Sequence, residues 1–117
     1  MKPLIHFAHA NGVPSKVYQK LFDLLKDEYD IIYVPLLGPD KRYPIDNHWH
    51  SLTNQVIDSI VRQAHGRPVI GLGHSLGSVL TFQAALKRPE LFSQVIMLDP
   101  PMIMGKDAFA LHVAKLF

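Results

Sequence analysis

Residues 69–80 decide the fold, and they read Val-Ile-Gly-Leu-Gly-His-Ser-Leu-Gly-Ser-Val-Leu. The apolar run over 69–72 is typical of a buried strand, and it leads into Gly-His-Ser-Leu-Gly at 73–77. Apolar residues then recur at helical spacing: Leu76, Val79, Leu80 and Ala84. A serine in a sharp strand-to-helix turn projects its hydroxyl beyond the sheet, and the residues two positions away must be small to avoid a collision. The stretch therefore predicts a strand, a tight turn that carries Ser75, and a helix.

The segments on either side alternate between apolar runs and amphipathic stretches. Short apolar runs at 4–8, 31–34 and 95–98 predict three more buried strands. Two more helices are expected to begin at the N-cap serines Ser15 and Ser51. Their predicted inner faces consist of Val17, Leu21, Leu24 and Leu25 in the first, and of Leu52, Val56, Ile60 and Ala64 in the second.

The order of these elements predicts the fold class. Buried strands that alternate with amphipathic helices form right-handed βαβ units, so we expect an α/β three-layer sandwich with a mostly parallel sheet. Pro35 to His50 lacks periodicity and predicts a long loop, while 109–117 is apolar and helix-like.

Composition excludes several classes of protein. The chain has 117 residues, 48% of them hydrophobic and 19% charged, which fits one globular domain. Its net charge is only +2 and its basic residues are scattered, so nucleic acid is not an expected partner. The absence of cysteine excludes disulfides and a cysteine nucleophile, and no metal-ligand or phosphate-binding motif is present, so no cofactor is expected. With no signal peptide or long apolar run, we expect a cytoplasmic protein without membrane contact.

A second constellation, His9-Ala10-Asn11-Gly12, directly follows the first predicted strand. Acyl-transfer enzymes of this architecture need an N–H donor from that loop to stabilise an oxyanion. By its position Asn11 would supply this donor through its backbone, and the N–H of Leu76 at the start of the next helix would supply the other. An ordinary Asn-Gly turn is the alternative interpretation.

Taken together, these residues resemble the α/β-hydrolase family. Residues 4–12 are similar to its strand and oxyanion loop, 69–86 to its nucleophile strand, turn and helix, and 95–100 to the next strand, which leads into a cap. The resemblance implies that Ser75 is the nucleophile, that 1–100 form the amino-terminal portion of the hydrolase core, and that 101–117 begin the cap segment.

The family places its catalytic acid and histidine after the cap, and no residue here matches those positions. The chain therefore looks like the amino-terminal half of a hydrolase. We expect His9 to order the oxyanion loop by hydrogen bonding. The other histidines receive structural interpretations: His6 in a strand, His48 and His50 solvated in the long loop, His65 at a helix end, His74 within the motif and His112 in the cap segment.

A few further residues have alternative roles. Asp99 lies at the carboxyl end of the strand beside the nucleophile strand, where it could serve as the acid, although a hydrogen bond at the junction of sheet and cap is the favoured interpretation. The large side chains that could line an acyl pocket are Tyr43, Trp49, Met102 and Met104, although such residues fill cores more often than sites.

Two hypotheses follow for function. The first is a serine hydrolase that acts on a small ester, thioester or related acyl substrate through an acyl-enzyme on Ser75. A serine at the turn argues against the dehalogenase and epoxide hydrolase branches, which use aspartate there, while acyltransferase, perhydrolase and C–C hydrolase chemistry stay open. The second is a non-catalytic fragment or interaction module, whose open sheet edge needs the remaining half of the hydrolase or a second copy.

Overall fold

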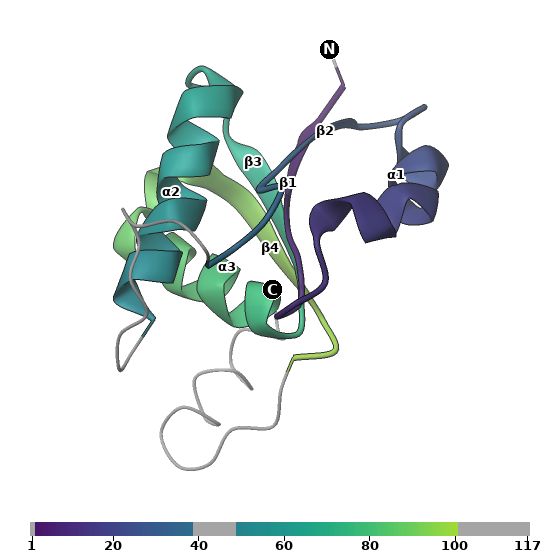
Figure 1. The fold of residues 1–117 in the computed structure, drawn as a ribbon. Helices are drawn as coiled ribbons and strands as arrows, with labels where there is room; N and C mark the ends of the chain where they lie inside the picture. The colour runs from purple at the N-terminus through teal and green to yellow at the C-terminus, as the bar shows by residue number, and fades with distance from the viewer. Residues whose placement is uncertain (1, 39–48, 101–117) are drawn as a thin grey trace.

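The computed structural model describes residues 2–38 and 49–100, which form a four-stranded parallel sheet with helices on both faces (Figure 1). The strands are β1 (Leu4–Ala8), β2 (Asp30–Tyr33), β3 (Val69–His74) and β4 (Phe92–Leu98), in the spatial order β2-β1-β3-β4. The predicted runs of β1, β3 and β4 lie within these strands, and β3 and β4 extend beyond their predicted bounds. The β2 strand is shifted by one residue from the predicted 31–34, because it begins at Asp30 and ends at Tyr33. The parallel sheet of an α/β protein is confirmed.

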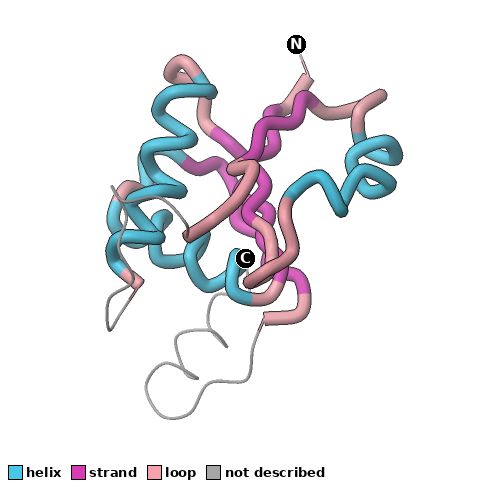
Figure 2. The backbone as a smooth tube through the Cα atoms, in the orientation of Figure 1, coloured by secondary structure: helices cyan, strands magenta, loops and turns pink. Residues whose placement is uncertain are grey.

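Helices occupy both faces of this sheet. The helices α2 (His50–Ala64) and α3 (Leu76–Lys87) cover one face, and α1 (Gln19–Leu25) covers the β1–β2 part of the other (Figure 2). The short 3₁₀ helix η1 (Ser15–Tyr18) precedes α1, and η2 (Pro89–Leu91) connects α3 to β4. The three-layer arrangement matches the prediction.

Side chains of β1 alternate between the two layers of the core. Ile5 and Phe7 pack with Phe22 of α1, whereas Leu4 and Ala8 belong to the larger cluster under α2 and α3. That cluster contains the whole predicted inner face of α2: Leu52, Val56, Ile60 and Ala64. The central strand is therefore buried on both sides, as expected for a parallel sheet.

The predicted helix start at Ser15 is wrong. Ser15 lies inside η1, where its buried hydroxyl donates to the carbonyl oxygen of Val34 at 2.5 Å. Because a 3₁₀ turn has three residues rather than 3.6, the inward face shifts, and Val17 and Leu24 are 63% and 81% exposed. Phe22 takes the buried position on α1 instead.

The predicted cap at Ser51 is also wrong, because α2 begins one residue earlier, at His50. Trp49 is the capping residue and adopts a left-handed conformation with φ of 55°. At the other end His65 is left-handed as well, with φ of 50°, and Gly66 follows, so the predicted end of this helix is confirmed.

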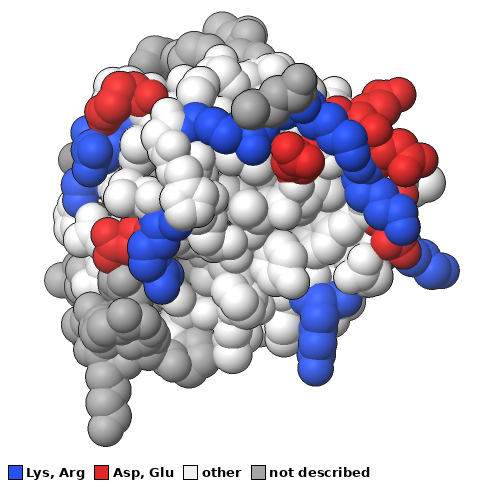
Figure 3. Space-filling view, turned by 90° about the horizontal axis from the view of Figure 1, so that it is seen from above, with Lys and Arg blue, Asp and Glu red and all other residues white. Residues whose placement is uncertain are grey.

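Several predictions lie outside the described residues: most of the loop over 35–50, the helix over 109–117 and the start of a cap at 101–117. No helix among the described residues is long and apolar enough to cross a membrane. Viewed from above, toward the N-terminal side of Figure 1, positive and negative side chains lie next to each other (Figure 3). Arg67 and Asp30 form an ion pair, and their charged atoms are 3.3 Å apart.

Candidate active site

Ser75 is the single residue between β3 and α3, and its backbone conformation is one that non-glycine residues rarely adopt. Its φ and ψ are 53° and −118°, between the last residue of β3 and the first residue of α3. Three hydrogen bonds hold this turn. The Ser75 N–H donates to the carbonyl oxygen of Leu98 at 3.0 Å, and the Ser75 carbonyl accepts the N–H of Ser78 at 3.0 Å and the Ser78 hydroxyl at 2.5 Å. Strained backbone of this kind persists only where its surroundings fix it, and it is common at functional sites.

The glycines on either side of Ser75 have no room for a side chain. A Cβ atom on Gly73 would lie 2.5 Å from the carbonyl oxygen of Gly77 and from the backbone of Ser78. A Cβ atom on Gly77 would collide with the carbonyl group of Ala8 at the end of β1. Both obstacles are backbone atoms, which cannot move aside as a side chain can. Larger residues at these two positions would therefore collide with the turn, as expected from the sequence. The same contact brings the start of α3 against the loop after β1.

In that loop, His9 is fully buried and makes two hydrogen bonds. The N–H of Leu37 donates to its Nε2 at 2.7 Å, so the ring proton must be on Nδ1, which donates to the carbonyl oxygen of Ala10 at 2.7 Å. Burial lowers the pKa of His9, which keeps the ring neutral. The predicted loop-ordering hydrogen bonds are confirmed, and both ring nitrogens are occupied, so His9 is not available as a general base for Ser75.

The two predicted oxyanion donors lie at the facing ends of these segments. Asn11 is exposed, and its N–H has no hydrogen-bond acceptor within residues 2–38 and 49–100. Leu76 is the first residue of α3, so its N–H has no acceptor within the helix. Unpaired N–H groups at a helix start and in a nearby loop are able to receive negative charge. Their role in catalysis stays a prediction.

The remaining histidines in the described part of the chain are engaged or remote. His74 contacts the hydroxyl of Tyr18 through Nδ1 at 2.8 Å, and His6 contacts the hydroxyl of Ser59 through Nε2 at 2.9 Å. His50 and His65 lie at the two ends of α2. None of these side chains is hydrogen-bonded to the Ser75 hydroxyl. His48 and His112 are outside the described residues.

Asp99 directly follows Leu98, whose carbonyl accepts the Ser75 N–H. It is exposed, has φ of 47°, and lies at the carboxyl end of β4 as the sequence indicates. Of the four proposed pocket residues, Trp49 packs against the larger core cluster, and the other three are outside the described residues: Tyr43, Met102 and Met104. The described residues contain no group of three His, Asp or Glu side chains that could hold a metal ion.

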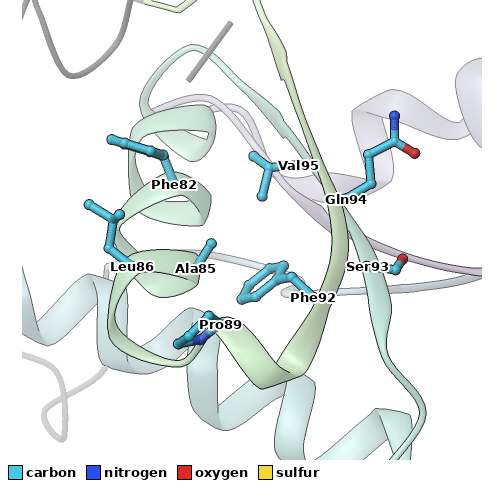
Figure 4. Close-up of a pocket in the computed structure, with 8 residues that line it drawn as sticks. All are labelled: Phe82, Ala85, Leu86, Pro89, Phe92, Ser93, Gln94 and Val95. Carbon is cyan, nitrogen blue, oxygen red and sulfur yellow. The ribbon is translucent and has the colours of Figure 1, made fainter. Parts of the chain in front are cut away.

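An apolar groove of about 450 Å³ lies away from Ser75, between the second half of α3 and the first half of β4. Figure 4 shows Phe92 and Val95 directed from β4 toward Phe82 and Ala85 of α3. Because it opens beside the amino-terminal part of β4, while Ser75 contacts the last residue of that strand, this groove is not a pocket for a group bound to Ser75.

Comparison with known proteins connects this geometry to a family. The family model described as the thioesterase domain matches residues 2–98. The chain belongs to the thioesterase domain family. Its fold is the α/β-hydrolase fold that the strand, turn and helix around Ser75 resemble.

The thioesterase-family chain is 30% identical over 83 residues to the uncharacterized hydrolase YugF of Bacillus subtilis, covering 69% of this chain and 30% of that protein. It is 26% identical over 116 residues to the monoglyceride lipase of Homo sapiens, covering 92% and 38%. A solved thioesterase domain from the curacin biosynthetic pathway has a TM-score of 0.70 at 20% identity, covering 89% of this chain and 38% of that one. The chain thus spans well under half the length of these relatives.

Sequence reasoning missed one residue that lies beside the candidate site, Tyr18. Its hydroxyl contacts the backbone of Ala10, eight residues away, and the side chain of His74, 56 residues away. No local pattern marks such a residue, because its partners meet only when β1 and β3 pair. The one available signal was an aromatic residue placed just after the predicted oxyanion loop.

Proposed function

We propose that this chain carries the nucleophile of a serine hydrolase that cleaves a small ester, thioester or related acyl substrate. The observation that supports it best is the backbone of Ser75, held at φ of 53° between β3 and α3 with glycine required on both sides. Membership of the thioesterase domain family and the similarity to a monoglyceride lipase both favour acyl transfer to water.

In the proposed reaction the Ser75 oxygen attacks the acyl carbon, and a histidine supported by a carboxylate takes the hydroxyl proton. The N–H groups of Asn11 and Leu76 stabilise the negative charge that forms on the acyl oxygen. The intermediate then expels an alcohol or thiol, which receives the proton from the histidine. Water, activated by the same histidine, attacks the acyl-enzyme, releases the carboxylic acid and regenerates Ser75.

The nucleophile is tested with a fluorophosphonate probe, which forms a covalent bond to an activated serine. We expect labelling of the full-length protein to map to Ser75 and to disappear in Ser75→Ala. Ser93→Ala is the matched control, because Ser93 is an exposed serine on β4 whose loss leaves the turn intact. Labelling that survives in Ser75→Ala would overturn the assignment.

The donor role of Asn11 is tested by two substitutions, one that keeps the backbone N–H and one that removes it. Asn11→Ala keeps the backbone N–H, so we expect a modest fall in turnover. Asn11→Pro removes that N–H and should lower kcat by about 10²–10³-fold, as loss of one oxyanion donor does in other enzymes. Equal damage from both substitutions would show that the side chain, rather than the backbone, is the important group.

A second candidate function is a non-catalytic module that associates through its open sheet edge. It is favoured by the outer edge of β4, which pairs with no other strand in the described part of the chain, and by Ile96 and Leu98, which are 36% and 37% exposed on that strand. In the hydrolase proposal, residues 1–100 are the amino-terminal portion of the core, 101–117 begin a cap, and the rest of the hydrolase covers this edge. The intact mass of the cellular protein separates the two: a mass near 13.2 kDa would favour the module or a homo-oligomer.

A further inference from the structure

The hydroxyl of Tyr18 joins the two segments that carry the candidate catalytic groups. It accepts the backbone N–H of Ala10 at 3.1 Å and contacts Nδ1 of His74 at 2.8 Å. Ala10 precedes Asn11 in the loop after β1, and His74 precedes Ser75 at the end of β3. One oxygen atom thus connects the backbone beside a predicted oxyanion donor to the residue beside the predicted nucleophile.

One assignment of protons satisfies every member of this group. The Tyr18 oxygen accepts the proton of the Ala10 N–H, and its own hydroxyl proton is then free to be donated. We assign that proton to Nδ1 of His74, the partner within reach, which places the proton of the neutral ring on Nε2. In this arrangement every group of the hydrogen-bonded series has a partner: the Ala10 N–H, the Tyr18 hydroxyl and Nδ1 of His74.

The next peptide group, between Ala10 and Asn11, is fixed through its carbonyl oxygen. Its carbonyl oxygen accepts two protons, from Nδ1 of His9 at 2.7 Å and from the N–H of Val13 at 3.0 Å. In a planar trans peptide the N–H points opposite to the carbonyl, so these bonds also set the direction of the Asn11 N–H. The bond from Tyr18 to the Ala10 N–H fixes the preceding peptide, and the loop cannot rotate about Ala10 without breaking a bond.

Tyr18 is itself held in place from two directions. Its ring packs on Phe7 of β1 with centroids 4.5 Å apart, and meets the ring of His74 edge-on at 5.7 Å. Its helix η1 is attached to the chain after β2 by Ser15, whose N–H donates to Pro35 and whose hydroxyl donates to Val34. The hydroxyl therefore approaches both loops from a rigid support.

We propose that Tyr18 is a positioning residue of the active site, which sets the distance between the Asn11 N–H and the Ser75–Leu76 turn. This inference rests on the proposed serine hydrolase function and deepens it. Oxyanion stabilisation depends on donors that are already in place when charge develops, and here the two donors belong to different elements. Their relative position depends on the Tyr18 bridge together with the close packing of Gly77 on Ala8.

The test is Tyr18→Phe in the full-length protein, which removes only the bridging oxygen and keeps the ring packing. We expect the rate constant for fluorophosphonate labelling of Ser75 to fall by about tenfold, less than the loss of a whole donor. With an ester substrate kcat should fall while KM stays within about twofold, because the bridge acts on the transition state. Tyr29→Phe is the matched control: its half-buried ring packs against the same apolar cluster, and its labelling rate should not change.

A second variant tests the bridge itself. His74→Leu removes the acceptor of the Tyr18 proton, and if the two residues act as one unit, the double variant should label no more slowly than the slower single variant. Amide hydrogen exchange at Ala10 should become faster in Tyr18→Phe, a change that does not depend on catalysis. Labelling of Tyr18→Phe at the wild-type rate, or additive effects of the two substitutions, would overturn the inference. Failure of the wild-type protein to label would instead overturn the proposed function.

Discussion

His6 is a histidine enclosed in the larger core layer beneath the candidate site. It is fully buried on β1, with Nε2 2.9 Å from the hydroxyl of Ser59 on α2. Its Nδ1 has no hydrogen-bond partner among the described residues. Burial without an opposing charge lowers the pKa of His6 to about 3, so the ring is neutral in the folded protein at any ordinary pH.

This burial predicts a loss of stability in acid. The unfolded chain binds a proton at His6 near pH 6.5, whereas the folded chain does so only near pH 3. The contribution of His6 to the free energy of unfolding is therefore fully present above pH 6.5. It is lost as the pH drops toward 3, by about 1.4 kcal/mol per pH unit. Urea unfolding at pH 7 and 4.5 should show this fall, and His6→Leu should make it smaller, leaving the part that the lowered pKa of His9 contributes in the same direction. His65→Asn, at an exposed position, should keep the wild-type slope; equal slopes in all three proteins would contradict the prediction.

A methyl group added at Gly77 should lower the free energy of unfolding more than one added at Gly71 of β3. Gly77→Ala meets the backbone of Ala8, which cannot move without disturbing β1, so we expect destabilisation of about 3 kcal/mol. Gly71→Ala meets only the side chains of Thr81 and Phe92, which are able to shift, and should cost less. Thermal unfolding of the two variants checks the order, and a more stable Gly77→Ala than Gly71→Ala would refute the steric account.

At the scale of elements, η1 shows how a short helix is fixed by tertiary contacts rather than by a cap. The Ser15 hydroxyl is buried and donates to the Val34 carbonyl at the end of β2. Ser15→Ala leaves that buried carbonyl without its donor and should lower the free energy of unfolding by about 1–3 kcal/mol. Ser93→Ala is the comparison, because Ser93 is an exposed residue whose hydroxyl lies 3.3 Å from its acceptor, the carbonyl oxygen of Val69, so urea unfolding should show a smaller change. Similar losses in both variants would argue against the anchoring role.

The elements themselves were largely predictable from the sequence, and their ends were not. The β1 strand was predicted with its observed bounds, because a buried parallel strand is mostly apolar, and here only His6 interrupts the run. The turn at Ser75 was predictable because its chemistry is local. Ser15 was misassigned as a cap because its true acceptor, Val34, is distant in sequence, and local patterns carry no information on such contacts. The same limit hid Tyr18.

At the scale of the whole molecule, β4 is an edge strand, and no strand among residues 2–38 and 49–100 pairs with its outer side. The groove between α3 and β4 opens along the same edge, and Leu86 at its rim is 66% exposed. An apolar surface next to a free strand edge is a place where further structure adds to a sheet. The relatives, of which this chain spans 30% and 38%, are long enough to supply it.

This edge leads to a prediction about activity. The 117 residues alone should not hydrolyse p-nitrophenyl acetate above background, because no histidine of the described residues contacts the Ser75 hydroxyl to activate it. A full-length protein, measured in parallel, should show saturable turnover that is lost in Ser75→Ala. Saturable turnover by the 117 residues, lost on mutation of Asp99 together with one of their own histidines, would show that the short chain is a complete enzyme.

The hydrogen bond from the Ser75 N–H to the Leu98 carbonyl also imposes an order on events during synthesis. Leu98 leaves the ribosome after Ser75, so for a time the serine has no partner that holds its backbone at positive φ. A lone serine relaxes from such a conformation, since nothing nearby opposes the strain. Ser75 therefore reaches its observed backbone conformation only once β4 has been made and paired with β3, and a nascent chain that stops before Leu98 contains the serine but lacks the contact that holds its turn.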